Sequence, residues 1–250
     1  MPLKKLVAGN WKMHGLSNDL AEVQAIAAAS GRYPEVDVAL CVPAILIERA
    51  ARAVSGFPIG GQDVHQAEKG AHTGCISAQM LLDAGAVLTI VGHSERRDAQ
   101  RESDAEVKAK AEAALGCGLS VILCVGEMLE VRDAGAAVPT VLAQLDGSLP
   151  DRSSGEAELA IAYEPVWAIG TGKVPTPSEI AEMHGAIRER LADRYPAEGE
   201  HIRILYGGSV KPSNAAEIFA VPNVDGALVG GASLTAGDFM PIVAAAAGAG

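Results

Sequence analysis

Residues 159–172 read Leu-Ala-Ile-Ala-Tyr-Glu-Pro-Val-Trp-Ala-Ile-Gly-Thr-Gly, an apolar run followed by one carboxylate and a proline. Residues 159–163 form a short apolar run typical of a buried strand, which places Glu164 where that strand ends. Pro165 restricts the backbone at this point, and the residues after it are small or apolar up to Gly172. The stretch predicts a strand that presents a carboxylate at the base of a stiff flap, whose closure would exclude water from a reacting site.

Similar apolar, β-branched runs recur along the chain, each followed by a turn and a helical pattern. They predict strands over residues 5–10, 36–41, 59–62, 88–92, 121–124, 159–163, 202–206 and 226–229. Between them, helical patterns include residues 18–29, 45–54, 103–115, 138–145, 178–194 and 214–219. This alternation indicates an α/β fold with a parallel sheet covered by helices, and eight units favour a closed barrel. The main alternative is a doubly wound open sheet. Such a sheet normally carries a GxGxxG turn after its first strand, and this sequence has none there.

Composition and charge narrow the classes of function. The chain has 250 residues, of which 49% are hydrophobic, so we expect one catalytic domain over residues 1–250. A net charge of -11 argues against a basic groove, and we expect no nucleic acid partner. Without a signal peptide or an apolar run of about twenty residues, we expect a cytoplasmic protein that makes no membrane contact. The four cysteines and six histidines show no metal-ligand spacing, so we expect no metal site.

The residues directly after the predicted strands are the candidates for chemistry, because closed α/β barrels carry their active sites at the carboxyl ends of the strands. The first strand ends in Asn10-Trp11-Lys12, and the fourth is followed by His93. Backbone amides at the helix start after His93 disfavour a second proton on the ring. We therefore expect a neutral imidazole that donates a hydrogen bond.

Paired glycines follow the last two predicted strands, in residues 206–209 and 229–231. Tight turns would explain either pair alone. Glycine allows a ligand to approach the backbone, however, and successive amides can form a concave anion site, which barrels of this kind commonly have here. Together with Gly170 in the flap, these turns predict a site for a small phosphorylated substrate whose reacting carbons lie between Glu164 and His93.

Taken together, these stretches resemble the triosephosphate isomerase family over essentially the full length of the chain. The matching stretches, in the family's order, are residues 9–13, 91–97, 124–127, 163–172, 206–210 and 225–234. The resemblance implies a closed (βα)8 TIM barrel that interconverts dihydroxyacetone phosphate and D-glyceraldehyde 3-phosphate through an enediolate, in glycolysis and gluconeogenesis. It also implies that no metal or organic cofactor takes part.

The same resemblance assigns roles to individual residues. Glu164 is implied to be the base that moves a proton between the two carbons, and His93 to polarise the carbonyl and move protons between the oxygens. Lys12 and Asn10 are implied to bind the substrate and stabilise the charge on oxygen, with Glu95 holding Lys12 in place. Contacts to the substrate phosphate are implied for the backbone at Gly170, Ser209, Gly230 and Gly231.

Residues 63–76 form a long connection after the third predicted strand, and long loops in compact domains usually have a function. The resemblance implies a homodimer in which this loop reaches into the partner. The loop tip reads Thr73-Gly74-Cys75, where the family commonly has Thr-Gly-Glu, so a carboxylate is missing from the expected interface.

Two alternative functions stay open from the sequence. The first is another phosphate-binding barrel enzyme, although a Schiff-base aldolase would need a lysine inside a late strand. The second is a catalytically silent barrel that serves as a binding protein. Loss of Lys12, His93 or Glu164 would favour that alternative, and all three are present.

Overall fold

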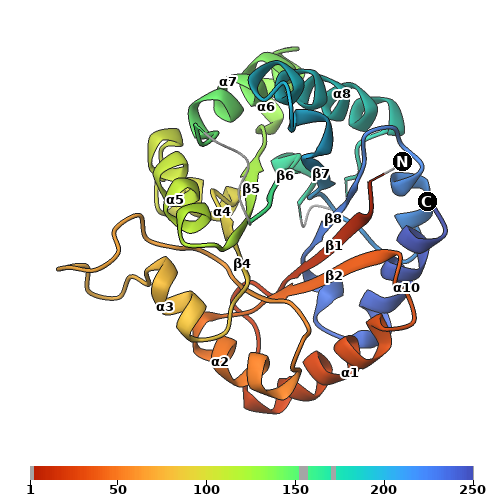
Figure 1. Cartoon of the computed structure of the whole chain (residues 1–250). Coiled ribbons are helices and arrows are strands. Elements are labelled where there is room, and N and C mark those ends of the chain that lie inside the picture. Colours follow the sequence, from red (N-terminus) through yellow and green to blue (C-terminus); the bar gives the residue numbers. More distant parts are fainter. Residues whose placement is uncertain (1–2, 152–156, 170–172, 250) are drawn as a thin grey trace.

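The computed structural model describes residues 3–151, 157–169 and 173–249, and within them eight strands close into a barrel (Figure 1). Each strand pairs in parallel with the next, and β8 pairs with β1. The strands are β1 Lys5–Asn10, β2 Val36–Cys41, β3 Ile59–Gly61, β4 Leu88–Val91, β5 Ser120–Val125, β6 Leu159–Tyr163, β7 Arg203–Tyr206 and β8 Gly226–Val229. The predicted closed barrel is confirmed, with β3, β4 and β7 differing from prediction by one residue at one end and β5 by one residue at each end.

Helices cover the outside of the barrel (Figure 1). They are α1 Leu20–Ser30, α2 Ala44–Ala53, α3 Ala78–Asp83, α4 Ser94–Ala99, α5 Asp104–Gly116, α6 Leu129–Asp133, α7 Ala137–Ser148, α8 Pro177–Arg194, α9 Ala215–Phe219 and α10 Ala236–Ala247. None of those in the described part of the chain has the length and apolar character that a membrane span needs. Helices α3, α4 and α6 lie outside the predicted ranges, although a helix start after His93 was expected. Five or six residues make fewer than two helical turns and give a weak period, which was enough for a prediction only at α9. Helix α10 also lies outside them, and Pro241 interrupts its pattern.

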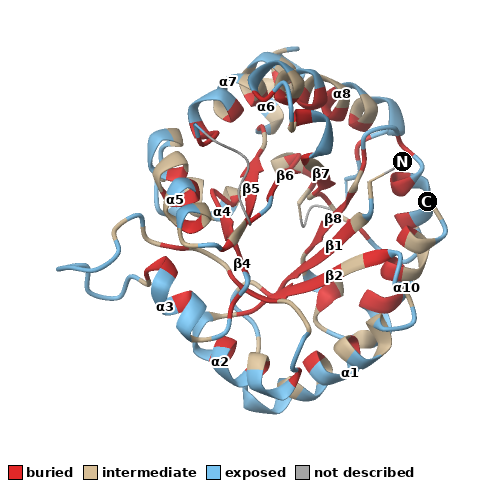
Figure 2. Cartoon of the chain, viewed as in Figure 1, coloured by how far each residue is buried: buried red, intermediate tan, exposed pale blue. Residues whose placement is uncertain are grey.

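Side chains along the strands alternate between the inside of the barrel and the helices that surround it. The strands are buried almost throughout (Figure 2). The inner set is Leu6, Ala8, Ala39, Cys41, Leu88, Ile90, Ile122, Cys124, Ala160, Ala162, Leu205 and Leu228. The neighbours of these residues, such as Val7 and Ile161, belong to the larger cluster shared with the helices. This period of two sets the direction of each strand's next residue, and therefore of Asn10 and Glu164.

Helix α8 buries an uncharged histidine against the barrel. His184 is fully buried, and its ring meets that of Tyr163 edge-on with the centroids 5.9 Å apart. Its Nδ1 lies 2.9 Å from the carbonyl oxygen of Asn223. Because that oxygen can only accept a hydrogen bond, the neutral ring carries its proton on Nδ1. Burial lowers the pKa of His184 to about 4, against the opposing effect of the Asn223 carbonyl.

We predict that His184 makes the protein less stable as the pH falls from 6.5 towards 4. In this window His184 becomes protonated in the unfolded chain but stays neutral in the folded chain. Its contribution therefore lowers the free energy of unfolding by roughly 3 kcal/mol. His184→Asn keeps an N–H for Asn223 and cannot titrate. Urea unfolding between pH 4 and 7 should therefore show a weaker pH dependence in the variant, and equal dependence in both proteins would contradict the prediction.

Candidate active site

Glycines leave space at the carboxyl-terminal mouth of the barrel, where the inward positions of the strands continue. Continuing the inward series of β5 and β7 by two residues leads to Gly126 and Gly207. A Cβ on Gly126 would lie 1.8 Å from the carbonyl oxygen of Glu164, and one on Gly207 would lie 2.8 Å from its Cγ. Larger residues at either position would displace Glu164, so Gly126 makes room for its backbone and Gly207 for its side chain.

Glu164 and His93 face each other at this mouth. His93 Nε2 lies 3.0 Å from Glu164 Oε1, and their side chains are only 7% and 2% exposed. The other carboxylate oxygen, Oε2, accepts a hydrogen bond of 2.9 Å from the backbone N–H of Ser94. The Glu164 N–H donates to the carbonyl of Val125 on β5 at 2.7 Å. Both oxygens of the predicted base are therefore held by groups at the start of α4.

A turn at Gly92 brings His93 to this position. Gly92 has φ +65, in the left-handed region, and a Cβ there would lie 2.8 Å from Val107. His93 is the N-cap of α4, and its Nδ1 accepts a hydrogen bond of 3.2 Å from the Glu95 N–H. With Nδ1 as the acceptor, the neutral ring carries its proton on Nε2 and donates it to Glu164.

The two groups shift each other's pKa. Burial opposes a charge on His93, but the Glu164 carboxylate outweighs it, so the pKa of His93 is raised. This direction is opposite to the one expected from the helix start alone, because that expectation left out the carboxylate. Burial likewise opposes the charge on Glu164, yet His93 and the Ser94 amide lower its pKa. The pair therefore keeps Glu164 ionised, as a base requires.

Lys12 lies beside this pair in a strained turn. Its φ of +52 is unusual for a residue with a side chain. The turn is held by Asn10, whose Oδ1 accepts from the Lys12 N–H at 3.0 Å, and by Gln62, whose Nε2 donates to the Lys12 carbonyl at 2.9 Å. Glu95 holds the ammonium, with Nζ 2.5 Å from Oε1. Gln62 was not predicted as a site residue, because the carbonyl that it contacts belongs to Lys12, 50 positions away in sequence.

The predicted anion site lines the same cavity as Glu164. A Cβ added to Gly231 would meet nothing within 4 Å, and one on Gly230 would meet only Lys12 Cε, at 3.5 Å. The carbonyl of Ser209 accepts from Asn214 Nδ2 at 3.0 Å, which fixes the turn after β7. The backbone here is open to a ligand, and a cation lies beside it.

One cavity of about 300 Å³ joins these groups. Its lining includes the predicted Asn10, Lys12, His93, Glu164, Ser209, Gly230 and Gly231. Glu95 is set back from this cavity and contacts it through Lys12, while the predicted Gly170 falls outside the described residues. A carboxylate base, an imidazole donor and an ammonium around one anion-sized space can transfer protons next to a carbonyl and stabilise the resulting negative charge.

Comparisons with known proteins agree on one family. The family model described as triosephosphate isomerase matches residues 5–246. The triosephosphate isomerase of Ruegeria sp. (strain TM1040) is 58% identical over 98% of this chain and 98% of its own. That of Ruegeria pomeroyi is 57% identical over 97% of each chain. A crystal structure of triosephosphate isomerase from Bartonella henselae superposes with a TM-score of 0.90 at 45% identity, covering 97% of this chain and 99% of that one.

We predict that Glu164→Gln lowers the pKa of His93. The substitution removes the carboxylate that raises this pKa and leaves burial and Lys12, which both lower it. An NMR titration of the histidine rings would measure the shift. Glu95→Gln serves as the control and should lower the pKa less, because Glu95 is 56% exposed and lies 3.8 Å from Nδ1. A His93 pKa that is unchanged in Glu164→Gln would contradict the electrostatic coupling.

Proposed function

The chain belongs to the triosephosphate isomerase family, and we propose that Glu164 and His93 carry out the proton transfers of its reaction. The reaction interconverts dihydroxyacetone phosphate and D-glyceraldehyde 3-phosphate, and the chain is therefore an aldose–ketose isomerase. One hydrogen moves between neighbouring carbons and another between their oxygens. The observation that carries the proposal is the buried pair itself, with 3.0 Å between His93 Nε2 and Glu164 Oε1 at the wall of a small cavity.

Glu164 acts as the base. Its carboxylate accepts hydrogen bonds from the Ser94 amide and His93, and it has to exchange these partners for the substrate carbon. It then takes a proton from the carbon next to the carbonyl, which leaves an enediolate. The carboxylic acid formed in this step returns the proton to the neighbouring carbon.

His93 and Lys12 manage the charge that develops on oxygen. His93 presents Nε2–H to the substrate carbonyl, polarises it, and moves protons between the two oxygens. The Lys12 ammonium and the Asn10 side chain line the same cavity and stabilise the enediolate, and Glu95 keeps Lys12 in position. Such preorganised groups are most effective where water is excluded.

The substrate phosphate binds to the backbone of Ser209, Gly230 and Gly231, which line the same cavity, with Lys12 close by. Gly170, to which the family resemblance assigns a further phosphate contact, lies outside the described residues. The flap over residues 165–173 closes on the bound phosphate and excludes water, so that the enediolate does not lose its phosphate. Ile169 of the flap already lines the cavity, and Trp167 Nε1 donates to Glu127 at 2.9 Å.

We further propose that residues 1–250 form a single catalytic domain and that two chains form a homodimer through residues 63–76. That loop projects from the body of the molecule (Figure 1). Met13 is 96% exposed and lines the same hollow as Cys75 and Ile76. An exposed apolar side chain beside a projecting loop fits a partner surface. We place the enzyme in the cytoplasm, because glycolysis supplies its substrate there.

Sedimentation velocity tests the dimer. We expect a mass twice the 25.6 kDa of the chain, and Met13→Asp should shift it towards the monomer because a charge would be buried at the interface. Val87→Asp is the control, since Val87 is also exposed, at 50%, but lies at the amino-terminal end of the barrel. A monomeric wild-type chain, or equal effects of both variants, would contradict this interface.

A coupled assay tests the catalytic assignment, with glyceraldehyde 3-phosphate as the substrate and enzymatic reduction of the ketone product as the readout. We expect Glu164→Gln to lower kcat by a factor on the order of a thousand, because the amide keeps the shape of the side chain but cannot accept the proton. Binding of a substrate analogue should persist. Full activity in this variant would remove Glu164 from the mechanism.

A further inference from the structure

The short helix α4 carries three contacts of the proposed site. His93 caps it and meets Glu164, the Ser94 amide also meets Glu164, and Glu95 holds Lys12. Helix α4 spans only Ser94–Ala99, and an isolated helix of this length is not stable in water. Contacts outside the helix must therefore set the geometry of these groups.

One anchor of α4 is Arg97, which is bound to the barrel wall. Its guanidinium donates to the carbonyls of Gly92, at 2.8 Å, and of Cys124, at 3.2 Å. It also donates to Ser148, at 2.9 Å, and pairs with Asp104 at 2.6 Å. These contacts tie α4 to the ends of β4 and β5.

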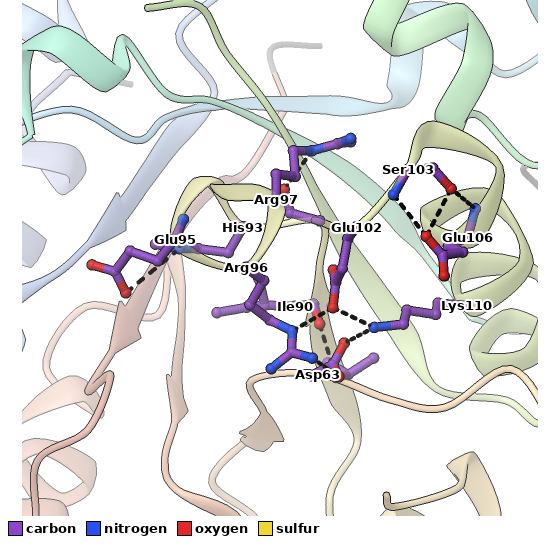
Figure 3. Close-up of polar contacts among 12 residues, drawn as sticks. Asp63, Ile90, His93, Glu95, Arg96, Arg97, Glu102, Ser103, Glu106 and Lys110 are labelled. Carbon is purple, nitrogen blue, oxygen red and sulfur yellow. Dashed lines mark hydrogen bonds and ion pairs between the residues drawn. The ribbon is translucent and has the colours of Figure 1, made fainter. Parts of the chain in front are cut away.

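The second anchor is a charged quartet formed by Asp63, Arg96, Glu102 and Lys110 (Figure 3). Arg96 contacts Asp63 at 2.7 Å and Glu102 at 2.7 Å. Lys110 contacts the same two carboxylates, at 2.7 Å and 2.6 Å. Figure 3 shows the side chains of Arg96 and Arg97 leaving α4 in different directions, so the quartet supports the side that Arg97 does not.

The quartet is partly buried, with the side chains of Arg96 and Asp63 35% and 27% exposed, and this burial has a cost that stability alone does not explain. The side chains of Lys110 and Glu102 are 8% and 6% exposed. Within the described residues, Glu102 Oε2 is buried without a hydrogen-bond partner. Burial raises the pKa of Asp63 in spite of the two neighbouring cations. Buried ion pairs often fail to repay their desolvation, so a geometric role accounts for the quartet better than a stabilising one.

We propose that Asp63, Arg96, Glu102 and Lys110 are positioning residues that hold α4 so that His93 and Glu95 reach Glu164 and Lys12. The inference rests on the proposed function of those four site residues. Asp63 directly follows the turn after β3, Glu102 lies between α4 and α5, and Lys110 lies on α5, so the quartet joins α4 to three separate points of the fold.

The backbone transmits the position of Arg96 directly to the site. The N–H groups of Arg96 and Arg97 donate to the His93 carbonyl, at 2.8 Å and 3.1 Å. A displaced Arg96 therefore moves His93, whose Nε2 lies 3.0 Å from Glu164. It also moves Glu95, which lies 2.5 Å from the Lys12 ammonium. Proton transfer and charge stabilisation depend steeply on such distances, so a small displacement lowers kcat.

Asp63→Asn tests the proposal, with Asp37→Asn as a matched control. Asp37 likewise bridges a lysine and an arginine, Lys4 at 2.6 Å and Arg203 at 2.7 Å, but it lies on β2 near the opposite end of the barrel. We expect Asp63→Asn to lower kcat by about tenfold with little change in KM, and Asp37→Asn to change neither. The ¹⁵N spectrum and pKa of the His93 ring should change in Asp63→Asn alone.

Arg96→Lys is a second variant, because it keeps the charge but cannot bridge two carboxylates with one planar group, and it should also lower kcat. Activities are compared at concentrations where sedimentation gives the wild-type mass. The proposal is overturned if kcat and the His93 signals stay unchanged in both variants, or if KM alone rises. If both variants fail to assemble or to fold, the quartet serves assembly or folding, and the positioning proposal is likewise overturned. An inactive wild-type protein would refute the proposed function, while the NMR comparison would still test the quartet.

Discussion

Closure of eight parallel strands into a barrel imposes the constraint on which the rest of the structure depends. Every strand must send alternate side chains into a narrow interior, which small residues such as Ala8, Ala160 and Ala162 help to fill. The same alternation continues to the next inward position, two residues beyond Ala8 and Ala162, and turns Asn10 and Glu164 inward. Gly126 and Gly207 leave room for the backbone and the side chain of Glu164 there. The packing rule that builds the core therefore also places the candidate base.

The site must bind a negatively charged phosphorylated substrate although the chain itself has a net charge of -11. It does so locally, with Lys12 and the backbone at Gly230 and Gly231 beside one cavity. The strained φ of Lys12 and the buried Glu164–His93 pair both cost folding free energy. The large apolar layer between strands and helices offsets these costs, so that the fold supports a geometry which its local segments would not adopt alone.

Much of this arrangement was predictable from local patterns. The eight strands follow from short apolar runs, and the residues at their ends follow from the rule that barrel sites lie at the carboxyl ends. The ranges of the short helices α3, α4 and α6 were not predicted, because five or six residues make fewer than two helical turns and give a weak period, which sufficed only for α9. Gln62 and the quartet were missed because their contacts are distant in sequence, with Gln62 and Lys12 separated by 50 positions and Asp63 and Lys110 by 47. No local pattern marks such a contact.

The sequence by itself determined the alternation of strands and helices, the family resemblance and the identity of the proposed catalytic groups, because these depend on local periodicity and on contiguous motifs. Only the tertiary structure decided how those groups affect each other. The expectation of a neutral His93 from its helix start left out Glu164, which lies 71 positions away in sequence and 3.0 Å away in space. That carboxylate raises the pKa of His93, because the energy between two charges depends on their separation and burial, and folding alone sets both.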